Sequence, residues 1–390
     1  MLHLLPLALL LHAGPGDTLP TITAYVASEA VDVVSRIHFG PGGATVEKVI
    51  KVDPRPSETD GPHNLNISPD QRYWYTSVAH GTPNGALWKF TTDTDSLVGI
   101  AVLSRFPATI SFSPDGEFAW VANFNLHGDM VPSSISVVYT PVMQEVARIP
   151  TCLMPHGMRV APDGTRAWMT CMMDDKLVEM DPATYAITRV ATLKPGGEHV
   201  MLTTSAMMPG EMDAMHGTMS HDAPAAGTST ACAPTWVQPS PDGTRLYLAC
   251  NRHAEVLEMD AGTLEVIRRI PTGKTPYNLA ISADGRVLAA TLKGQQAFSV
   301  IDLVSGREVA QLKTSHTVPS GVQLTPDGRF ALVSCEGRAA EAGAVDLFDL
   351  RSRQLLSTVV VGAGAGGIQI LSYTPEAGGN PSAQGARSPD

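Results

Sequence analysis

The sequence predicts an all-β protein in which seven four-stranded sheets form a single ring, a seven-bladed β-propeller. Three observations support this prediction: a turn motif that recurs, a regular spacing between its copies, and four strand-like runs in each interval. The stretch from Pro234 to Pro276 shows the unit most clearly. Each of its runs has the length of a strand and is bounded by turn residues, and none is long enough for a helix.

The recurring turn has Pro and Gly at the positions that tight turns favour, as in Ser240-Pro-Asp-Gly243. Successive aspartates of this turn are 45, 48, 79, 42 and 43 residues apart, and the interval of 79 residues is one repeat with an insertion. A four-stranded sheet cannot bury both of its faces alone, so repeats of this length pack around a ring. The six aspartates are Asp70, Asp115, Asp163, Asp242, Asp284 and Asp327.

The two ends of the chain supply the seventh blade. Residues 367–370 resemble a first strand with nothing after it, whereas residues 23–27, 31–38 and 45–52 resemble second, third and fourth strands with nothing before them. Pairing of these segments would close the ring and remove the free sheet edges that promote aggregation. We therefore expect the N- and C-terminal strands to share one sheet.

The remaining segments divide the chain into a leader, a propeller and a tail. We expect a signal peptide or a disordered leader at 1–18, the propeller at 19–373 with an insertion at 195–233, and a disordered tail at 374–390. The net charge, 27 − 38 = −11, comes without a basic cluster, which argues against a nucleic-acid partner. We expect a monomer without a transmembrane span.

Two features predict a periplasmic or secreted protein. The apolar run at 1–13 has the length of a signal-peptide core and is too short to span a membrane; a mis-assigned start or a disordered apolar tail is the alternative. Four cysteines bracket equivalent hairpins at separations of 19 and 18 residues, within disulfide reach across adjacent strands. The alternative to disulfides is that these cysteines are small buried thiols, because Cys171, Cys250 and Cys335 occupy the same position of the repeat. The predicted pairs are Cys152 with Cys171 and Cys232 with Cys250.

The second strands of the repeats resemble a known family. Residues 246–251, Leu-Tyr-Leu-Ala-Cys-Asn, and residues 120–123, Trp-Val-Ala-Asn, are similar to the YVTN repeat of bacteria and archaea. Between about residues 20 and 372 the chain resembles a YVTN-type (YncE-like) seven-bladed propeller. The resemblance implies the fold but no particular activity, because the scaffold hosts enzymes, cofactor carriers and binding modules.

One face of the predicted ring collects histidines. Loops between second and third strands lie on the same face as the connections between blades, whereas the Pro-Asp-Gly turns lie on the other. His63 and His156 hold equivalent positions at inner strands, near the mouth of the channel. They are candidates for binding a metal, a cofactor or an anionic substrate, or else hydrogen-bonded residues that hold the channel entry. The candidate ligand residues are His63, His80, His127, His156 and His253.

The insertion is rich in methionine and histidine. Six of the chain's 16 methionines lie between residues 198 and 222, together with three histidines. Thioethers and imidazoles are ligands that copper accepts, so this segment is a candidate copper site; a mobile flap of adaptable methionines over the mouth is the alternative. The candidate metal ligands are His199, Met201, Met212, Met215, His216, Met219 and His221.

No catalytic motif accompanies these residues. The sequence has neither a Gly-rich phosphate loop nor a G-x-S-x-G elbow. We therefore expect a binding protein for a metal ion, copper first, or for a small ligand. The alternatives are a lactonase-like hydrolase or metal-dependent oxidoreductase that uses the same face, and a scaffold for another protein. The charged candidates on this face are Asp129, Asp174, Asp175, Arg252 and Glu336.

Overall fold

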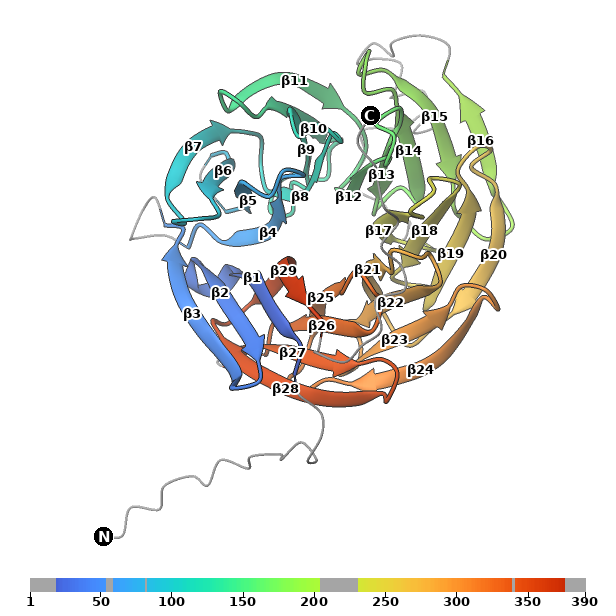
Figure 1. The fold of residues 1–390 in the computed structure, drawn as a ribbon. Coiled ribbons are helices and arrows are strands. Elements are labelled where there is room, and N and C mark those ends of the chain that lie inside the picture. Colours follow the sequence, from blue (N-terminus) through green and yellow to red (C-terminus); the bar gives the residue numbers. More distant parts are fainter. Residues whose placement is uncertain (1–18, 54–58, 81–82, 204–230, 339–340, 376–390) are drawn as a thin grey trace, which may run out of the picture.

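The computed structural model describes residues 19–53, 59–80, 83–203, 231–338 and 341–375. Their strands form seven antiparallel sheets arranged around a ring (Figure 1). Helical structure in these residues is limited to the 3-10 turn η1 (Glu29–Val31). The prediction of an all-β, seven-bladed propeller is confirmed.

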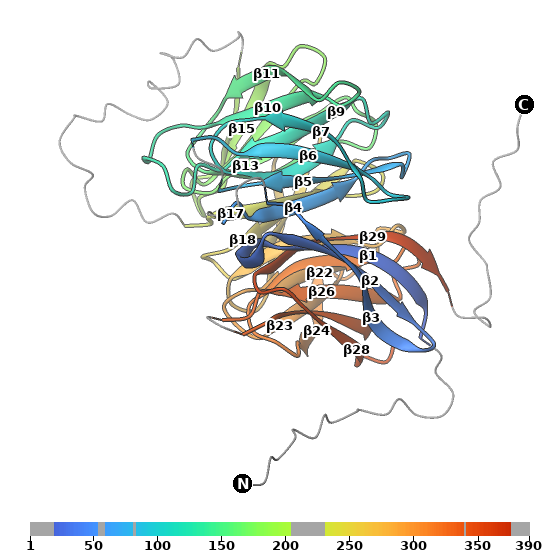
Figure 2. The ribbon, with the colours of Figure 1, turned by 90° about the vertical axis from the view of Figure 1, so that its left-hand side faces the viewer.

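Blade 1 is built from both ends of the chain. Its inner strand, β29 (Ala365–Thr374), pairs antiparallel with β1 (Thr21–Ser28). The sheet continues outwards through β2 (Val33–Gly40) and β3 (Gly43–Lys51). Figure 2 shows β29 and β1 side by side, next to the inner strand of blade 2. The predicted closure of the ring is therefore confirmed.

The other blades follow the chain order, each from its inner strand outwards. Blades 2 and 3 contain β4 (Pro62–Ile67), β5 (Tyr73–Val78), β6 (Ala86–Thr91), β7 (Leu97–Val102), β8 (Pro107–Phe112), β9 (Phe118–Asn123), β10 (Ser134–Tyr139) and β11 (Gln144–Pro150). Blades 4 and 5 contain β12 (Pro155–Val160), β13 (Ala167–Cys171), β14 (Lys176–Met180), β15 (Ile187–Thr192), β16 (His199–Leu202), β17 (Pro234–Pro239), β18 (Arg245–Cys250), β19 (Glu255–Asp260) and β20 (Val266–Pro271). Blades 6 and 7 contain β21 (Pro276–Ile281), β22 (Val287–Leu292), β23 (Ala297–Asp302), β24 (Arg307–Lys313), β25 (Pro319–Leu324), β26 (Phe330–Cys335), β27 (Gly343–Asp349) and β28 (Gln354–Val361).

The recurring turn joins the first and second strands of a blade through one local hydrogen-bond pattern. Ser113 Oγ donates to Asp115 Oδ1 at 2.5 Å, and the same oxygen accepts the backbone N–H of Glu117 at 2.9 Å. Gly116 has a φ of +75°, in the left-handed region that favours glycine. The same hydroxyl-to-carboxylate bond recurs at Ser240–Asp242, Ser282–Asp284 and Thr325–Asp327.

The hydrophobic core lies between neighbouring blades. Trp120 of β9, for example, is buried in a cluster with Met158, Met169 and Val178 of blade 4. Burying one large apolar side chain contributes about 1.5–3 kcal/mol, so each blade is stabilised mainly by its neighbours. This packing explains why the repeats need a closed ring.

Hydroxyl groups of second strands form hydrogen bonds to the inner strand of the next blade. Ser77 Oγ donates to the carbonyl of Ala108 at 2.7 Å, from blade 2 to blade 3. Thr291 Oγ1 donates in the same way to the carbonyl of Ser320 at 2.8 Å, from blade 6 to blade 7. Because each carbonyl belongs to the second residue of an inner strand, these bonds position the residues around the channel mouth.

Candidate functional site

Side chains from five blades converge at the end of the channel where the inner strands begin. We call this side of the ring the mouth face. Its polar groups come from η1, the starts of inner strands, and the loops that follow second strands. The residues that contact one another here lie far apart in the sequence, so closure of the ring brings them together. We call the following residues the mouth cluster: Glu29, His63, His80, His156, Tyr277, Lys293 and Glu336.

Glu29 joins two of the predicted histidines. Its Oε2 lies 2.9 Å from His63 Nδ1, and its Oε1 lies 2.7 Å from His80 Nε2. Burial by itself would raise the pKa of Glu29, but the charge of His63 and the hydrogen bonds from both imidazoles lower it well below its usual range. Glu29 is therefore a carboxylate that accepts one N–H from each ring.

Phe106 forms an apolar floor beside these imidazoles. Its ring centroid lies 5.1 Å from that of His63, 4.9 Å from that of His80 and 5.5 Å from that of His127. All three contacts are edge-to-face, a favourable arrangement of aromatic rings. The structure thus brings His63, His80 and His127 together around one phenyl ring.

His156 has both ring nitrogens occupied. Its Nδ1–H donates to the carbonyl of Thr235 at 2.6 Å, and its Nε2 accepts the hydroxyl of Tyr277 at 3.0 Å. The residue is 1% exposed, and burial, followed by the charge of His63, lowers its pKa to about 3. The ring centroids of His156 and His63 are 6.1 Å apart. His156 is therefore a neutral, hydrogen-bonded residue in the wall of the channel mouth.

Lys293 extends this wall towards blade 7. Its Nζ lies 3.8 Å from the centroid of the Tyr277 ring and 2.5 Å from Glu336 Oε1. Burial would lower the pKa of Lys293, but Tyr277 and Glu336 raise it above its usual value. The ammonium group is thus stabilised by a cation–π contact and an ion pair.

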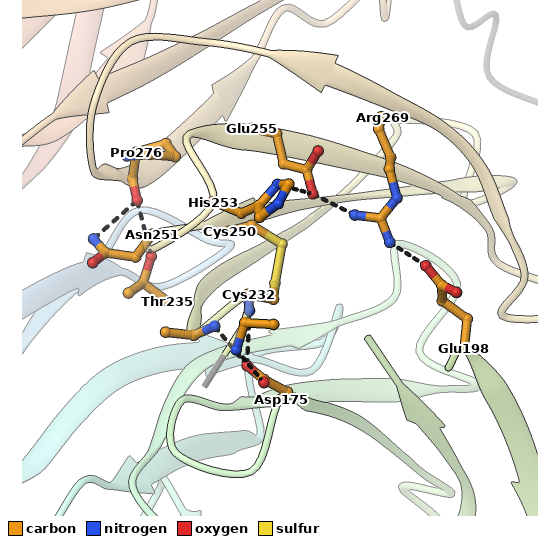
Figure 3. The surroundings of a disulfide bond; sticks show 12 residues. Asp175, Glu198, Cys232, Thr235, Cys250, Asn251, His253, Glu255, Arg269 and Pro276 are labelled. Atoms are coloured by element: carbon orange, nitrogen blue, oxygen red, sulfur yellow. Dashed lines mark hydrogen bonds and ion pairs between the residues drawn. A yellow bond between two sulfur atoms is a disulfide. The ribbon is translucent and has the colours of Figure 1, made fainter. Parts of the chain in front are cut away.

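His253 lies on the mouth face but in a different group. Its Nδ1 is 3.2 Å from Glu255 Oε1, and Glu255 also pairs with Arg269. Arg269 reaches across to Glu198, so the row connects blade 5 to the edge of blade 4 (Figure 3). These contacts assign His253 to a structural ion-pair row.

Both predicted disulfides are present. Cys152–Cys171 and Cys232–Cys250 have Cα–Cα distances of 5.9 and 4.5 Å. Beside the second, Asp175 accepts the backbone N–H groups of residues 231, 232 and 233, at 2.6–3.0 Å (Figure 3). Asp175 therefore anchors the chain where it enters blade 5. Cys335 is a buried free thiol.

The start of the predicted insertion forms an additional strand. β16 carries His199 and Met201, and it pairs with β15 at the outer edge of blade 4. His199 is exposed, with Nδ1 3.0 Å from the carbonyl of Gly197. This strand was not anticipated from the sequence. The other candidate metal ligands, Met212, Met215, His216, Met219 and His221, lie outside the described residues.

No three or more His, Cys, Asp or Glu side chains within the described residues are arranged to hold a metal ion. At Glu29 the reason is visible, because the ring nitrogens of His63 and His80 point at carboxylate oxygens. The described part of the chain also contains no helix long and apolar enough to cross a membrane.

Comparisons with known proteins agree with the class of fold, a β-propeller. The family model for the YNCE-like beta-propellers matches residues 230–374. The chain is therefore similar to the YNCE-like β-propellers over its C-terminal blades, and the complete ring shows the seven-bladed fold. None of the curated proteins matches the chain.

Solved structures share the fold at low sequence identity. Hydrazine synthase of Kuenenia stuttgartiensis is 17% identical with a TM-score of 0.60; the match covers 84% of this chain and 99% of that one. A functionally unknown protein from Desulfotomaculum acetoxidans is 14% identical, with a TM-score of 0.65 and coverage of 90% and 98%. A "putative 6-phosphogluconolactonase" from Bacteroides fragilis is 15% identical, with a TM-score of 0.66 and coverage of 92% and 99%. At these identities the likeness concerns the fold alone.

Proposed function

We propose that this chain is an extracytoplasmic binding protein that holds a small polar ligand at its mouth face. The supporting observation is the mouth cluster, in which carboxylate, imidazole, phenol and ammonium groups from blades 1, 2, 4, 6 and 7 converge. Stacking of blades needs apolar burial and the backbone ladders, and these are complete without such a cluster. Convergent polar groups on loops of a rigid scaffold are typical of binding sites.

Export is part of this proposal. Disulfides persist in oxidising compartments and are rare in the cytosol, and the chain has two of them in equivalent hairpins. The predicted signal peptide at 1–18 lies outside the described residues. Expression with and without residues 1–18, followed by fractionation of cells, tests this part.

The binding site is tested by a ligand screen on the full chain. Wild type is compared with a His63→Ala, His80→Ala double variant in a thermal-shift screen of small polar molecules. His253→Ala is the matched control, since it removes an imidazole from the same face but outside the mouth cluster. We expect hits that stabilise wild type and the control and have no effect on the double variant. Hits that are unchanged in the double variant would place binding elsewhere.

Copper binding by the Met/His segment is a second candidate, supported by the density of thioethers and imidazoles between residues 198 and 222. Deletion of residues 204–222 leaves β16 in place and removes Met212, Met215, His216, Met219 and His221. We expect wild type to compete for Cu(I) and the deletion to lose this capacity, with Cu(II) affinity falling below about pH 6 as histidines protonate. Equal weak binding by both proteins would exclude this segment as a copper site.

Hydrolysis is the catalytic alternative, since a carboxylate beside imidazoles is also a general-base arrangement. The fold is shared with two structures titled "putative 6-phosphogluconolactonase". Turnover of δ-lactones by wild type, lost in Glu29→Gln, would replace the binding function with hydrolysis. Absence of turnover alongside ligand binding would support the proposal.

A further inference from the structure

A cavity of about 240 Å³ opens beside the mouth cluster, between blades 2 and 3. His80 lies on one side of it, in the loop after β5, and Arg105 lies in the connection from β7 to β8. Phe106 forms its floor, and His127 comes from the loop after β9. Three separate loops therefore place cationic or protonatable groups around one apolar surface.

Arg105 is an exposed cation of this cavity. Within the described residues no carboxylate pairs with its exposed guanidinium group. His127 is likewise exposed and makes ring contacts, 5.1 Å from His80 and 5.5 Å from Phe106, centroid to centroid. The nearest described carboxylate of the mouth cluster, Glu29, is already engaged by two imidazoles. The cavity therefore presents a positive charge, that of Arg105, which no carboxylate of the described residues neutralises.

The walls of the cavity are held in place by backbone contacts. Phe106 has a φ of +51°, and its carbonyl accepts the N–H of Phe124 at 2.7 Å. Asn125 donates from Nδ2 to the carbonyl of Asp129 at 3.1 Å, and its own carbonyl accepts the N–H of Gly128 at 3.1 Å. These bonds close the turn that carries His127 over the cavity. Groups fixed in this way lose little conformational entropy when a ligand binds.

His80 is oriented towards the cavity by its bond to Glu29. Because Nε2–H donates to the carboxylate, the other ring nitrogen, Nδ1, is the one left for a ligand. Arg105 adds a planar fork of donors, which matches the oxygens of a carboxylate or a phosphate.

We propose that this cavity binds the oxyanion group, carboxylate or phosphate, of a small molecule whose flat apolar part lies on Phe106. The inference rests on the proposed function and specifies the ligand class of the mouth face. Arg105 and His80 bind the oxyanion, and the rings of Phe106 and His127 contact the flat part. The cavity volume limits the ligand to roughly one ring with its anionic group, below the size of drug-like ligands.

The test is a titration of the full chain with benzoate, phenyl phosphate, inorganic phosphate, benzyl alcohol and benzamidine, followed by calorimetry and NMR. We expect benzoate or phenyl phosphate to bind at least tenfold more tightly than benzyl alcohol or benzamidine, because only the anions engage the guanidinium group. The comparison of benzoate with phenyl phosphate distinguishes a carboxylate from a phosphate site. Weaker binding of inorganic phosphate than of phenyl phosphate would show the contribution of the ring.

Matched variants locate the site. Arg105→Gln should weaken binding of the preferred anion about tenfold or more, and His127→Gln should weaken it to a smaller extent. Lys274→Gln is the control. Lys274 is an exposed cation two residues before the first residue of β21, and Arg105 holds the equivalent position two residues before β8. Equal binding by Arg105→Gln and wild type, or a preference for benzamidine, would overturn the inference. If screen hits still depend on His63 and His80 in that case, the proposed function stands and only the ligand class is wrong.

Discussion

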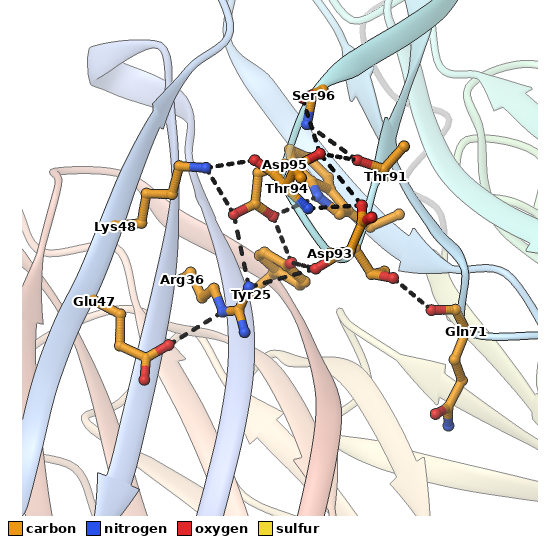
Figure 4. A network of polar contacts seen from close by, with 12 residues as sticks. Tyr25, Arg36, Glu47, Lys48, Gln71, Thr91, Asp93, Thr94, Asp95 and Ser96 are labelled. Atoms are coloured by element: carbon orange, nitrogen blue, oxygen red, sulfur yellow. Dashed lines mark hydrogen bonds and ion pairs between the residues drawn. The ribbon is translucent and has the colours of Figure 1, made fainter.

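Tyr25 donates its phenolic hydrogen to Asp95 Oδ1 at 2.6 Å, which connects the terminal blade to the outer turn of blade 2 (Figure 4). The same carboxylate accepts Trp74 Nε1–H at 3.1 Å and lies 3.1 Å from Lys48 Nζ. Burial, then the bond to Asp95, raises the pKa of Tyr25 well above its usual value, so the phenol remains protonated. This contact therefore ties β1 and β3 to the ring from the outside, while β29 closes it from the inside.

Replacing Asp95 with Asn should destabilise the protein more than replacing Tyr25 with Phe. Tyr25→Phe removes one hydrogen bond, worth about 1 kcal/mol, and leaves Asp95 with its other donors. Asp95→Asn introduces an N–H₂ group among the donors that surround this buried position, so we expect a loss of about 2–3 kcal/mol. Urea unfolding of both variants measures the difference. Equal losses would show that Tyr25 is the main partner.

Removal of β29 should destabilise the whole ring. A chain that ends before Ala365 loses the ladder with β1 and the burial of Ile368, which together cost several kcal/mol. A chain that ends after Pro375 keeps the strand and is the control. Thermal unfolding should show a lower melting temperature for the first truncation only. An unchanged melting temperature would contradict the role of the terminal strand in closure.

Reduction of the two disulfides should lower the free energy of unfolding, but Cys335 should remain inaccessible to alkylation in the folded protein. Loops of 18 and 19 residues are worth roughly 3 kcal/mol each by the chain-entropy argument. Burial raises the pKa of Cys335 to about 12, so alkylation of this thiol should require unfolding. Peptide mapping under non-reducing conditions should recover both pairs. Five free thiols in protein from an oxidising compartment would contradict this prediction.

The repeat pattern of the sequence predicts the fold because turn chemistry and spacing are local properties. The Pro-Asp-Gly turns determine where each blade begins, and the closure follows from the incomplete blades at the two ends. The disulfides were predictable for the same reason, since each pair spans one hairpin of known register. Their pairing needed no knowledge of how the blades pack.

The mouth cluster could be predicted only in part. His63 and His156 have a repeat position that points to the channel, and Tyr277 shares it. Glu29 was missed because it contacts His63 and His80 across 34 and 51 residues, and nothing local marks it. The position of His253 in the repeat indicates the correct face but not its distance from the channel. β16 was missed because it contains no turn motif and pairs only with the edge of blade 4.

His156 should make the protein less stable in acid, and an uncharged substitute should reduce this dependence. Its pKa is about 3 in the folded state and about 6.5 when unfolded, so between these values the unfolded chain binds one more proton. Stability therefore falls as pH decreases below about 6.5, by about 2 kcal/mol between pH 7 and 5 from this group.

His156→Asn keeps a donor for Thr235 but loses the acceptor for Tyr277, which costs about 1–3 kcal/mol at pH 7. Urea unfolding at both pH values should show a smaller decrease for His156→Asn than for wild type, and the same decrease for the control His253→Asn. Parallel losses in wild type and His156→Asn would show that His156 takes up its proton in the folded state.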